Sequence, residues 1–338
     1  MIEFIHKKLI SLFQKDKKKT EIFKKTFTMQ FIEENLKEID LSKYTSLYRS
    51  FYDPYFSDRY LRSQFIKEAH DSNVILKRLS FTEKFQEKLF QLIFSPIIDE
   101  FRFYHYSSFE SVINILKTQK IRFSSIAGLN DKSEIYYTEK LLNREIKQPY
   151  HPKRIQYFNS RFILSNSLNQ DELNQWRLYG ENGKGICLEF KKVNKHIINS
   201  NFSFGKIAYG NNIYQIFLEL IIGLIKNYNS IVIFNQLDLW KHFVKHEDYK
   251  PENELRILFH NSKKNGTSKA LNFRTNSFGI FCPYIEFDFS ELPFELTGIY
   301  LGPKSEEPNL NRGQLNYFLR SSGLNKIKIT FSTKTHYR

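Results

Sequence analysis

The first hundred residues of the chain have the apolar spacing of helices. Apolar positions recur there at intervals of three and four among charged residues, as at Phe85, Leu89 and Leu92, and no glycine occurs before Pro96. Pro96 and the acidic pair at 99–100 then interrupt the pattern. We therefore predict an N-terminal helical region over residues 1–98.

After residue 99, short strand-like runs alternate with helical ones. A capping-box pattern, Ser107 with Glu110, predicts the start of one helix, and Asp171 is predicted to cap another. Further helices are expected over 213–225, 236–247 and 314–319. Strands are expected over 103–106, 122–124, 161–168, 185–190, 252–259, 298–301 and 326–331. The pattern predicts an α+β fold, with a mixed, mainly antiparallel domain over residues 99–338.

Composition is consistent with a globular chain of two domains. Of 338 residues, 41% are hydrophobic and 16% aromatic, which excludes a chain too poor in apolar surface to fold. Cys187 and Cys282 are the only cysteines, too few for a disulfide scaffold or a structural zinc knot, and they favour a cytoplasmic location. The most apolar stretch, 213–225, contains Glu219 and is too short to cross a bilayer, so we predict no membrane association.

The net charge of +15 leaves two interpretations open. A basic surplus of this size attracts polyanions such as nucleic acid. The chain is also rich in lysine, isoleucine, asparagine and phenylalanine, as proteins from AT-rich genomes commonly are. Only the clustering of basic side chains on one surface would separate a functional charge from compositional drift.

Short polar and aromatic blocks are set into the apolar runs of the second region. Apolar residues alone could supply the burial that drives folding, so these blocks suggest a functional site. The blocks are Tyr104–Ser108, Asn130–Glu134, Ser165–Ser167, Trp176–Gly180, Glu252–Arg256 and Leu301–Pro303.

In this order, the blocks resemble the bacterial family called domain of unknown function 2971, over about residues 104–338. The positions that carry the resemblance are Tyr104, His105, Asn130, Asp131, Glu134, Ser165, Trp176, Tyr179, Gly180, Gly185, Lys245, His246, Glu252, Glu254, Arg256, Gly302, Pro303, Ser332, Tyr337 and Arg338. Lys132 departs from the pattern, which usually has proline there. The family name carries no chemistry, so function must be argued from the site.

A second, looser pattern is similar to that of ADP-ribosyltransferases. It consists of His105 on a first strand, the Ser165–Ser167 block on a later strand, and Glu252 with Glu254 entering another. Asn166 stands where that pattern has threonine. The resemblance implies a split-sheet fold, NAD as the substrate, and transfer of ADP-ribose to a macromolecule or to water. It also implies a role in bacterial defence or a toxin-like response.

The roles of these residues follow from the chemistry that the resemblance implies. Cleavage of the nicotinamide bond passes through an oxocarbenium-like state, which Glu254 would stabilise. Glu252, two residues away on an extended backbone, would point to the same side and orient or deprotonate the acceptor. His105 would bond the ribose or the nicotinamide. The residues expected to bind NAD are Tyr104, Tyr106, Ser107, Ser165, Ser167, Trp176, Tyr179 and Arg256.

This hypothesis makes a strict spatial demand. His105, Ser165 and Glu254 must line one pocket, and a Glu254 on the opposite side of the sheet from His105 would contradict it. Each residue also has a purely structural interpretation. Glu252, Glu254 and Arg256 could form a local ion-pair network, and Trp176 with Tyr179 could pack against the core.

Two other functions stay open alongside the enzymatic one. The first is a nucleic-acid-binding module, with or without nuclease activity, in which basic side chains contact phosphates and aromatic side chains stack on bases. The second is a sensor or interaction protein without catalysis. The sequence leaves open the acceptor, whether nucleic acid or protein, and the oligomeric state.

One arrangement of histidines resembles a metal site. His242 and His246 are four apart on a predicted helix, next to Glu247. The glutamate does not directly follow the first histidine, so the zinc-protease signature is absent. We predict no bound metal.

Overall fold

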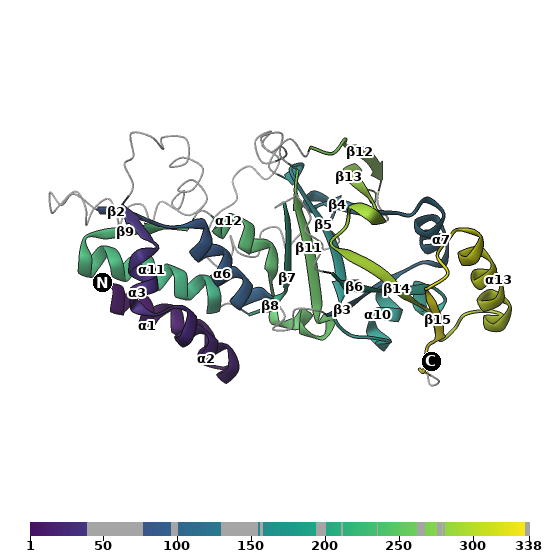
Figure 1. The fold of residues 1–338 in the computed structure, drawn as a ribbon, viewed down its shortest axis with the longest axis horizontal. Helices are drawn as coiled ribbons and strands as arrows, with labels where there is room; N and C mark the ends of the chain where they lie inside the picture. The colour runs from purple at the N-terminus through teal and green to yellow at the C-terminus, as the bar shows by residue number, and fades with distance from the viewer. Residues whose placement is uncertain are drawn as a thin grey trace. The chain divides into compact units, whose positions relative to one another are not determined.

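The computed structural model describes residues 1–38, 77–95, 101–129, 155, 158–193, 201–210, 212–234, 236–261, 268–275, 279 and 281–334. The chain divides into two compact units (Figure 1). The first contains Met1–Ser95, Ser133–Pro149 and Ala208–Glu247, and the second contains Pro96–Lys132, Tyr150–Ile207 and Asp248–Arg338. Residues 208–247 thus belong to the same unit as the N-terminal helices. The two domains predicted from the sequence, with one boundary after residue 98, do not include this return of the chain.

The first unit is mainly helical. Its helices are α1 (Ile2–Ile10), α2 (Lys17–Thr26), α3 (Met29–Glu34), α6 (Glu83–Phe94), α11 (Asn212–Tyr228) and α12 (Leu237–Trp240). Thr82 caps α6 by accepting a hydrogen bond from the backbone N–H of Phe85. The rings of Phe81 and Phe85 stack in its core, together with those of Phe23 and Phe27. The apolar spacing read from the sequence therefore does mark the buried face of α6.

Short strands complete the first unit. β1 (Leu36–Glu38), β2 (Lys77–Phe81) and β9 (Ser230–Ile233) form one small sheet, and β8 (Ala208–Tyr209) pairs with β10 (Val244–Lys245). The helix predicted over 236–247 is wrong, because α12 ends at Trp240 and the chain becomes extended at Val244. His242 and His246 therefore do not share the face of one helix.

The second unit is built on a ten-stranded sheet. All neighbouring strands are antiparallel except β14 and β15, so the predicted α+β fold with a mixed, mostly antiparallel sheet is confirmed. Among the described residues of this unit, three α-helices accompany the sheet: α7 (Phe109–Thr118), α10 (Leu173–Leu178) and α13 (Pro308–Ser321). The strands are β3 (Arg102–Ser107), β4 (Lys120–Ser125), β5 (Arg161–Ser167), β6 (Ile186–Lys192), β7 (Phe202–Lys206), β11 (Glu254–His260), β12 (Asn272–Thr275), β13 (Phe281–Asp288), β14 (Phe294–Leu301) and β15 (Lys328–Phe331).

Both predicted helix caps in this unit are off by one residue. Ser107 is the last residue of β3, and Ser108 accepts the capping hydrogen bond from the backbone N–H of Ser111. Glu172, not Asp171, caps α10 by accepting from two backbone N–H groups.

Strand β5 is the point at which the sheet divides. Along one edge it pairs with β11 over its whole length, from Ser167 opposite Glu254 to Arg161 opposite His260. Along the other edge it pairs with β4 only near its beginning and with β3 only at Ser167. Within the described part of the chain, the middle of β5 therefore has no strand partner on that edge.

The two faces of the sheet carry different side chains. One face bears the main apolar core, with Phe103, Leu164, Leu188 and Ile257 among its members. The other carries a smaller cluster of Tyr104, Tyr106, Trp176 and Cys187. Because side chains alternate along each strand, the pairing register decides which residues share a face. No helix in the described residues is long and apolar enough to span a bilayer.

Candidate functional site

His105 lies at the fork between β3 and β4. Its ring nitrogen Nδ1 is 3.1 Å from the carbonyl oxygen of Ser165, in the part of β5 that lacks a strand partner. A neutral imidazole that donates from Nδ1 satisfies this contact. Burial lowers the pKa of His105, although the Ser165 carbonyl and the Asn166 side chain act in the opposite direction. The imidazole thus replaces a missing ladder hydrogen bond.

Hydroxyls, a carboxylate and an aromatic ring share the face of β5 that lies opposite the main apolar core. Ser167 pairs with Glu254 on one side and with Tyr104 on the other, and Ser165 pairs with Arg256. Directly paired residues in an antiparallel sheet project to the same face. These five side chains therefore share one face of the sheet, which we call the Glu254 face. Ser165 is exposed there, whereas the other four are buried.

The register places Glu254 and His105 on opposite faces of the sheet. Tyr104 lies on the Glu254 face, so His105, the next residue of β3, faces the main core instead. Asn166 also faces the core, because it pairs with Leu255. The predicted pocket of His105, Ser165 and Glu254 is therefore not formed. For the same reason, the asparagine in place of threonine does not alter the Glu254 face.

Glu254 is held by Arg256 from the same strand. The guanidinium makes two hydrogen bonds to the carboxylate, with Nε 2.6 Å from Oε1 and Nη2 3.2 Å from Oε2. Their side chains are only 6% and 3% exposed. A bidentate pair of this kind fixes the carboxylate in orientation. The ion pair that the sequence offered as a structural interpretation is present.

Glu252 does not stand beside Glu254 as an extended backbone would place it. Glu252 ends a 3-10 helix, and Asn253 has a positive φ of 44°, so the strand begins only at Glu254. The Glu252 carboxylate accepts a hydrogen bond from the Tyr179 hydroxyl at 3.2 Å. Its backbone carbonyl accepts from Ser167 Oγ at 2.9 Å. Glu252 is half-buried, and Tyr179 and Ser165 are the exposed members of the predicted site.

Trp176 and Tyr106 have no free ring face for a ligand. Trp176 is fully buried and packs edge-on against Tyr106, and its Nε1 donates to Asp171 at 2.8 Å. Asp171 also accepts hydrogen bonds from the hydroxyls of Ser332 and Thr333. Both rings are buried, so the stacking role predicted for them is not supported: Trp176 is linked through Asp171 to the residues after β15, and the Tyr106 hydroxyl bonds the backbone of Asn169 and Glu172.

Sequence reasoning missed a second polar group near this face. Glu189 accepts hydrogen bonds from Tyr300 at 3.0 Å and Thr297 at 2.8 Å, and pairs with Arg102. Burial raises the pKa of Tyr104 to about 12, with a further contribution from the charge of Glu189. In the sequence, Glu189 looks like one polar residue of an alternating strand, and only the pairing of β6 with β3 and with β14 brings its partners together.

Close backbone packing requires glycine at positions 185 and 302. A Cβ atom at Gly185 would collide with the carbonyl oxygen of Ser107, and one at Gly302 would collide with that of Gly183. The backbone N–H of Gly302 donates to Gly185 at 3.0 Å. The backbone of Ser107, which was predicted to bind NAD, thus packs against Gly185. The blocks at Asn130, Asp131 and Glu134, and the terminal Tyr337 and Arg338, lie outside the described residues.

The comparison with protein families supports the first resemblance. Residues 175–257 match the family described as a protein of unknown function (DUF2971), so the predicted resemblance to that family is confirmed. No curated protein and no solved structure matches the chain. Among the described residues, no group of three His, Cys, Asp or Glu side chains is arranged to hold a metal ion.

Proposed function

We propose that the Glu254 face binds NAD and cleaves its nicotinamide glycosidic bond, in the manner of an ADP-ribosyltransferase. The observation that carries the proposal is the row formed by Ser165 and Ser167 opposite Arg256 and Glu254 on one face of β5 and β11. A ribose offers hydroxyls that serines can bond, and its C1′ develops positive charge that a fixed carboxylate can stabilise.

His105 has no ligand-binding role in this proposal. The strand register contradicts the arrangement predicted from the sequence, in which His105 and Glu254 line one pocket, so that arrangement is not proposed again. The proposal is therefore narrower: His105 is a positioning residue that holds β3 against the unpaired part of β5. The chemistry rests on the Glu254 face alone.

The step balances without a further reactant. The bond between ribose C1′ and the nicotinamide nitrogen breaks, and its electron pair leaves with nicotinamide. Glu254 stabilises the cation at C1′, and a water or an acceptor hydroxyl then forms the new bond there. Glu252 is half-buried and accepts a hydrogen bond from Tyr179, and in this proposal it accepts the proton that the nucleophile loses.

The test is release of nicotinamide from labelled NAD by the purified chain, with and without candidate acceptors. We expect Glu254→Gln to reduce turnover by about 10²- to 10³-fold, because the neutral amide cannot stabilise the developing charge. Glu286→Gln is the matched control, since Glu286 also pairs with an arginine of the same sheet, Arg122, at 2.9 Å. No turnover by the wild-type chain, or equal loss in the two variants, would contradict the proposal.

A further inference from the structure

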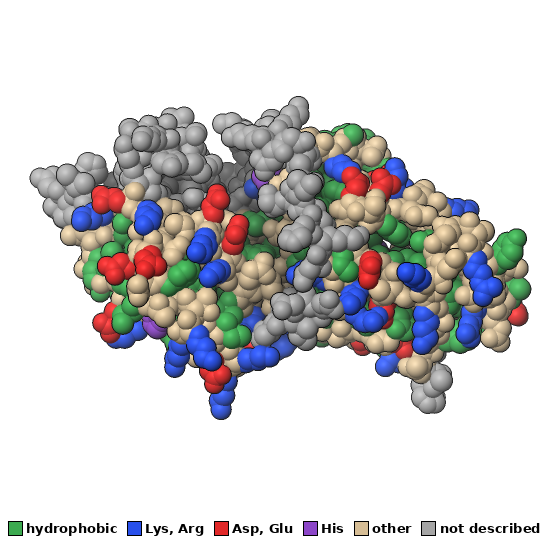
Figure 2. Space-filling model, viewed as in Figure 1, with side chains coloured by type: hydrophobic (Ala, Val, Ile, Leu, Met, Phe, Trp, Pro, Cys, Tyr) green, Lys and Arg blue, Asp and Glu red, His purple; other side chains and the backbone are tan. Residues whose placement is uncertain are grey.

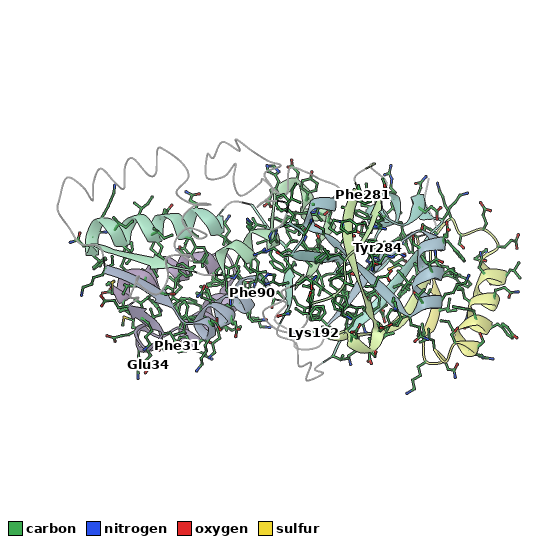
Figure 3. All side chains as sticks on the ribbon, turned by 90° about the horizontal axis from the view of Figure 1, so that it is seen from above. Phe31, Glu34, Phe90, Lys192, Phe281 and Tyr284 are labelled. Atoms are coloured by element: carbon green, nitrogen blue, oxygen red, sulfur yellow. The ribbon has the colours of Figure 1, made fainter. Side chains whose placement is uncertain are left out.

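Helix α13 has apolar residues on two opposite sides. On one side, Leu315 and Leu319 are buried in the main core. On the other, Leu310 is 59% exposed and Tyr317 is 76% exposed. Tyr317 follows Leu310 by two helical turns, so both side chains project from the same side of the helix. Figures 1 and 3 show α13 at the edge of the second unit, with side chains that extend away from the sheet.

The exposed side of α13 is complementary to itself. Its residues are Leu310, Gly313, Tyr317 and Arg320, which we call the α13 stripe. A Cβ atom at Gly313 would meet nothing within 4 Å, so the helix surface there is open. The intervals of three, four and three residues make the stripe symmetric about position 315. Two copies can therefore pack antiparallel around a two-fold axis, with the Tyr317 ring of each copy over Gly313 of the other.

The two ends of α13 carry opposite charges. Glu307 precedes the first turn of the helix, and Arg320 lies in its last turn. Both are exposed, and neither has an ion pair with any residue that the structure describes. In the antiparallel arrangement, Arg320 of each copy packs beside Leu310 of the other, one helical turn from Glu307. A basic end thus meets an acidic end at both ends of the pair, and the helix dipoles are opposed.

We propose that α13 is a self-association surface, on which two copies of this chain pack antiparallel through the α13 stripe. A second copy is the occupant because one surface supplies both halves of the match, an aromatic ring with an open position and a base with an acid. A single pair of helices makes a small interface, below the about 1,200 Å² of standard complexes. We therefore expect a weak, reversible dimer with a Kd of about 10 to 100 µM.

The experiment is sedimentation equilibrium of the full chain over about 1 to 300 µM, a range in which mass action populates such a dimer. Arg320→Glu is expected to raise the Kd at least about 10-fold, because it places an acid against the acidic end of the other copy. The matched control is Arg312→Glu, the same change on the same helix. The Arg312 guanidinium lies 5.3 Å from the ring centroid of Phe331 and is not part of the stripe, so we expect the Kd of this variant to equal that of the wild type.

A mixture of two variants tests whether the partner is a second copy. Glu307→Arg alone should weaken the dimer as Arg320→Glu does, because it places like charges together at both ends. When the two variants are mixed, each end of the mixed pair again has an acid beside a base. We expect the mixed dimer to form with about the affinity of the wild type. Variants that only disturb the fold of α13 would not restore each other.

The same measurements can overturn the proposal. A wild-type chain that stays monomeric at about 300 µM would do so, because the α13 stripe would then serve a different partner. A dimer that Arg320→Glu and Arg312→Glu weaken equally, or that neither weakens, would place the contact elsewhere on the chain. A mixture that stays monomeric would also contradict the antiparallel arrangement. Glu254→Gln should dimerise like the wild type, which separates this surface from the proposed NAD site.

Discussion

His105 takes over the role of a missing strand where β3 and β4 diverge. Replacing it with alanine should leave the Ser165 carbonyl without its partner. We expect His105→Ala to lower the free energy of unfolding by about 1 to 3 kcal/mol, as measured by urea denaturation. A variant as stable as the wild type would show that the imidazole does not hold the fork.

The same residue should make stability depend on pH. Burial keeps the pKa of His105 below its ordinary 6.5, so the unfolded chain binds this proton more readily than the folded one. The contribution of neutral His105 to the free energy of unfolding is complete above pH 6.5. It is lost as the pH falls through the lower pKa that His105 has in the folded chain. Urea denaturation between about pH 7.5 and 5.5 should show this loss in the wild type, and a smaller one in His105→Ala. Identical pH profiles would contradict the prediction.

Asp171 supports the fold beneath α10 and should titrate in acid. Burial alone would raise its pKa, but hydrogen bonds from Ser332, Thr333 and Trp176 lower it overall, below 3.8. This contribution to stability is present above the unfolded pKa and is lost as pH falls through the folded one. We expect Asp171→Asn to cost about 2 to 3 kcal/mol at neutral pH by urea denaturation. The variant should also lose less stability than the wild type between about pH 5 and 3, and an equal loss would argue against this role.

The turn carrying Gly302 packs against the loop at Gly183 and Gly185 with no room for a side chain. Gly302→Ala should lower the midpoint of thermal unfolding and reduce the free energy of unfolding by about 1 to 3 kcal/mol, because the backbone atoms around it cannot move away from the added Cβ. Gly313→Ala is the control, since Gly313 lies within α13 and a Cβ there meets nothing within 4 Å. It should be neutral or stabilising by up to about 1 kcal/mol. Equal effects at both positions would contradict the packing argument.

Periodicity predicted the strands and helices that bury one face or one stripe. The strand prediction over 161–168 and the helix prediction over 213–225 agree with β5 and α11 because burial imposes a repeat on their sequences. The sequence pattern did not predict strand β12, because all four of its residues are exposed and burial therefore imposes no alternation on them. The candidate site was harder to predict. Which face Glu254 occupies depends on the register with β5 and on the left-handed Asn253, and neither is a property of the local pattern.

The net charge of +15 does not by itself define a binding surface. Figure 2 shows Lys and Arg side chains interspersed with Asp and Glu across the drawn face, without one continuous basic area.

The central claim is that NAD chemistry belongs to the Glu254 face and does not need the imidazole on the opposite side of the sheet. Nicotinamide release by His105→Ala and Glu254→Gln, measured side by side at a temperature where circular dichroism finds both folded, tests this most directly. We expect turnover by His105→Ala to stay within about 10-fold of the wild type and turnover by Glu254→Gln to fall by about 10²- to 10³-fold. Loss of turnover in His105→Ala as large as in Glu254→Gln would contradict it.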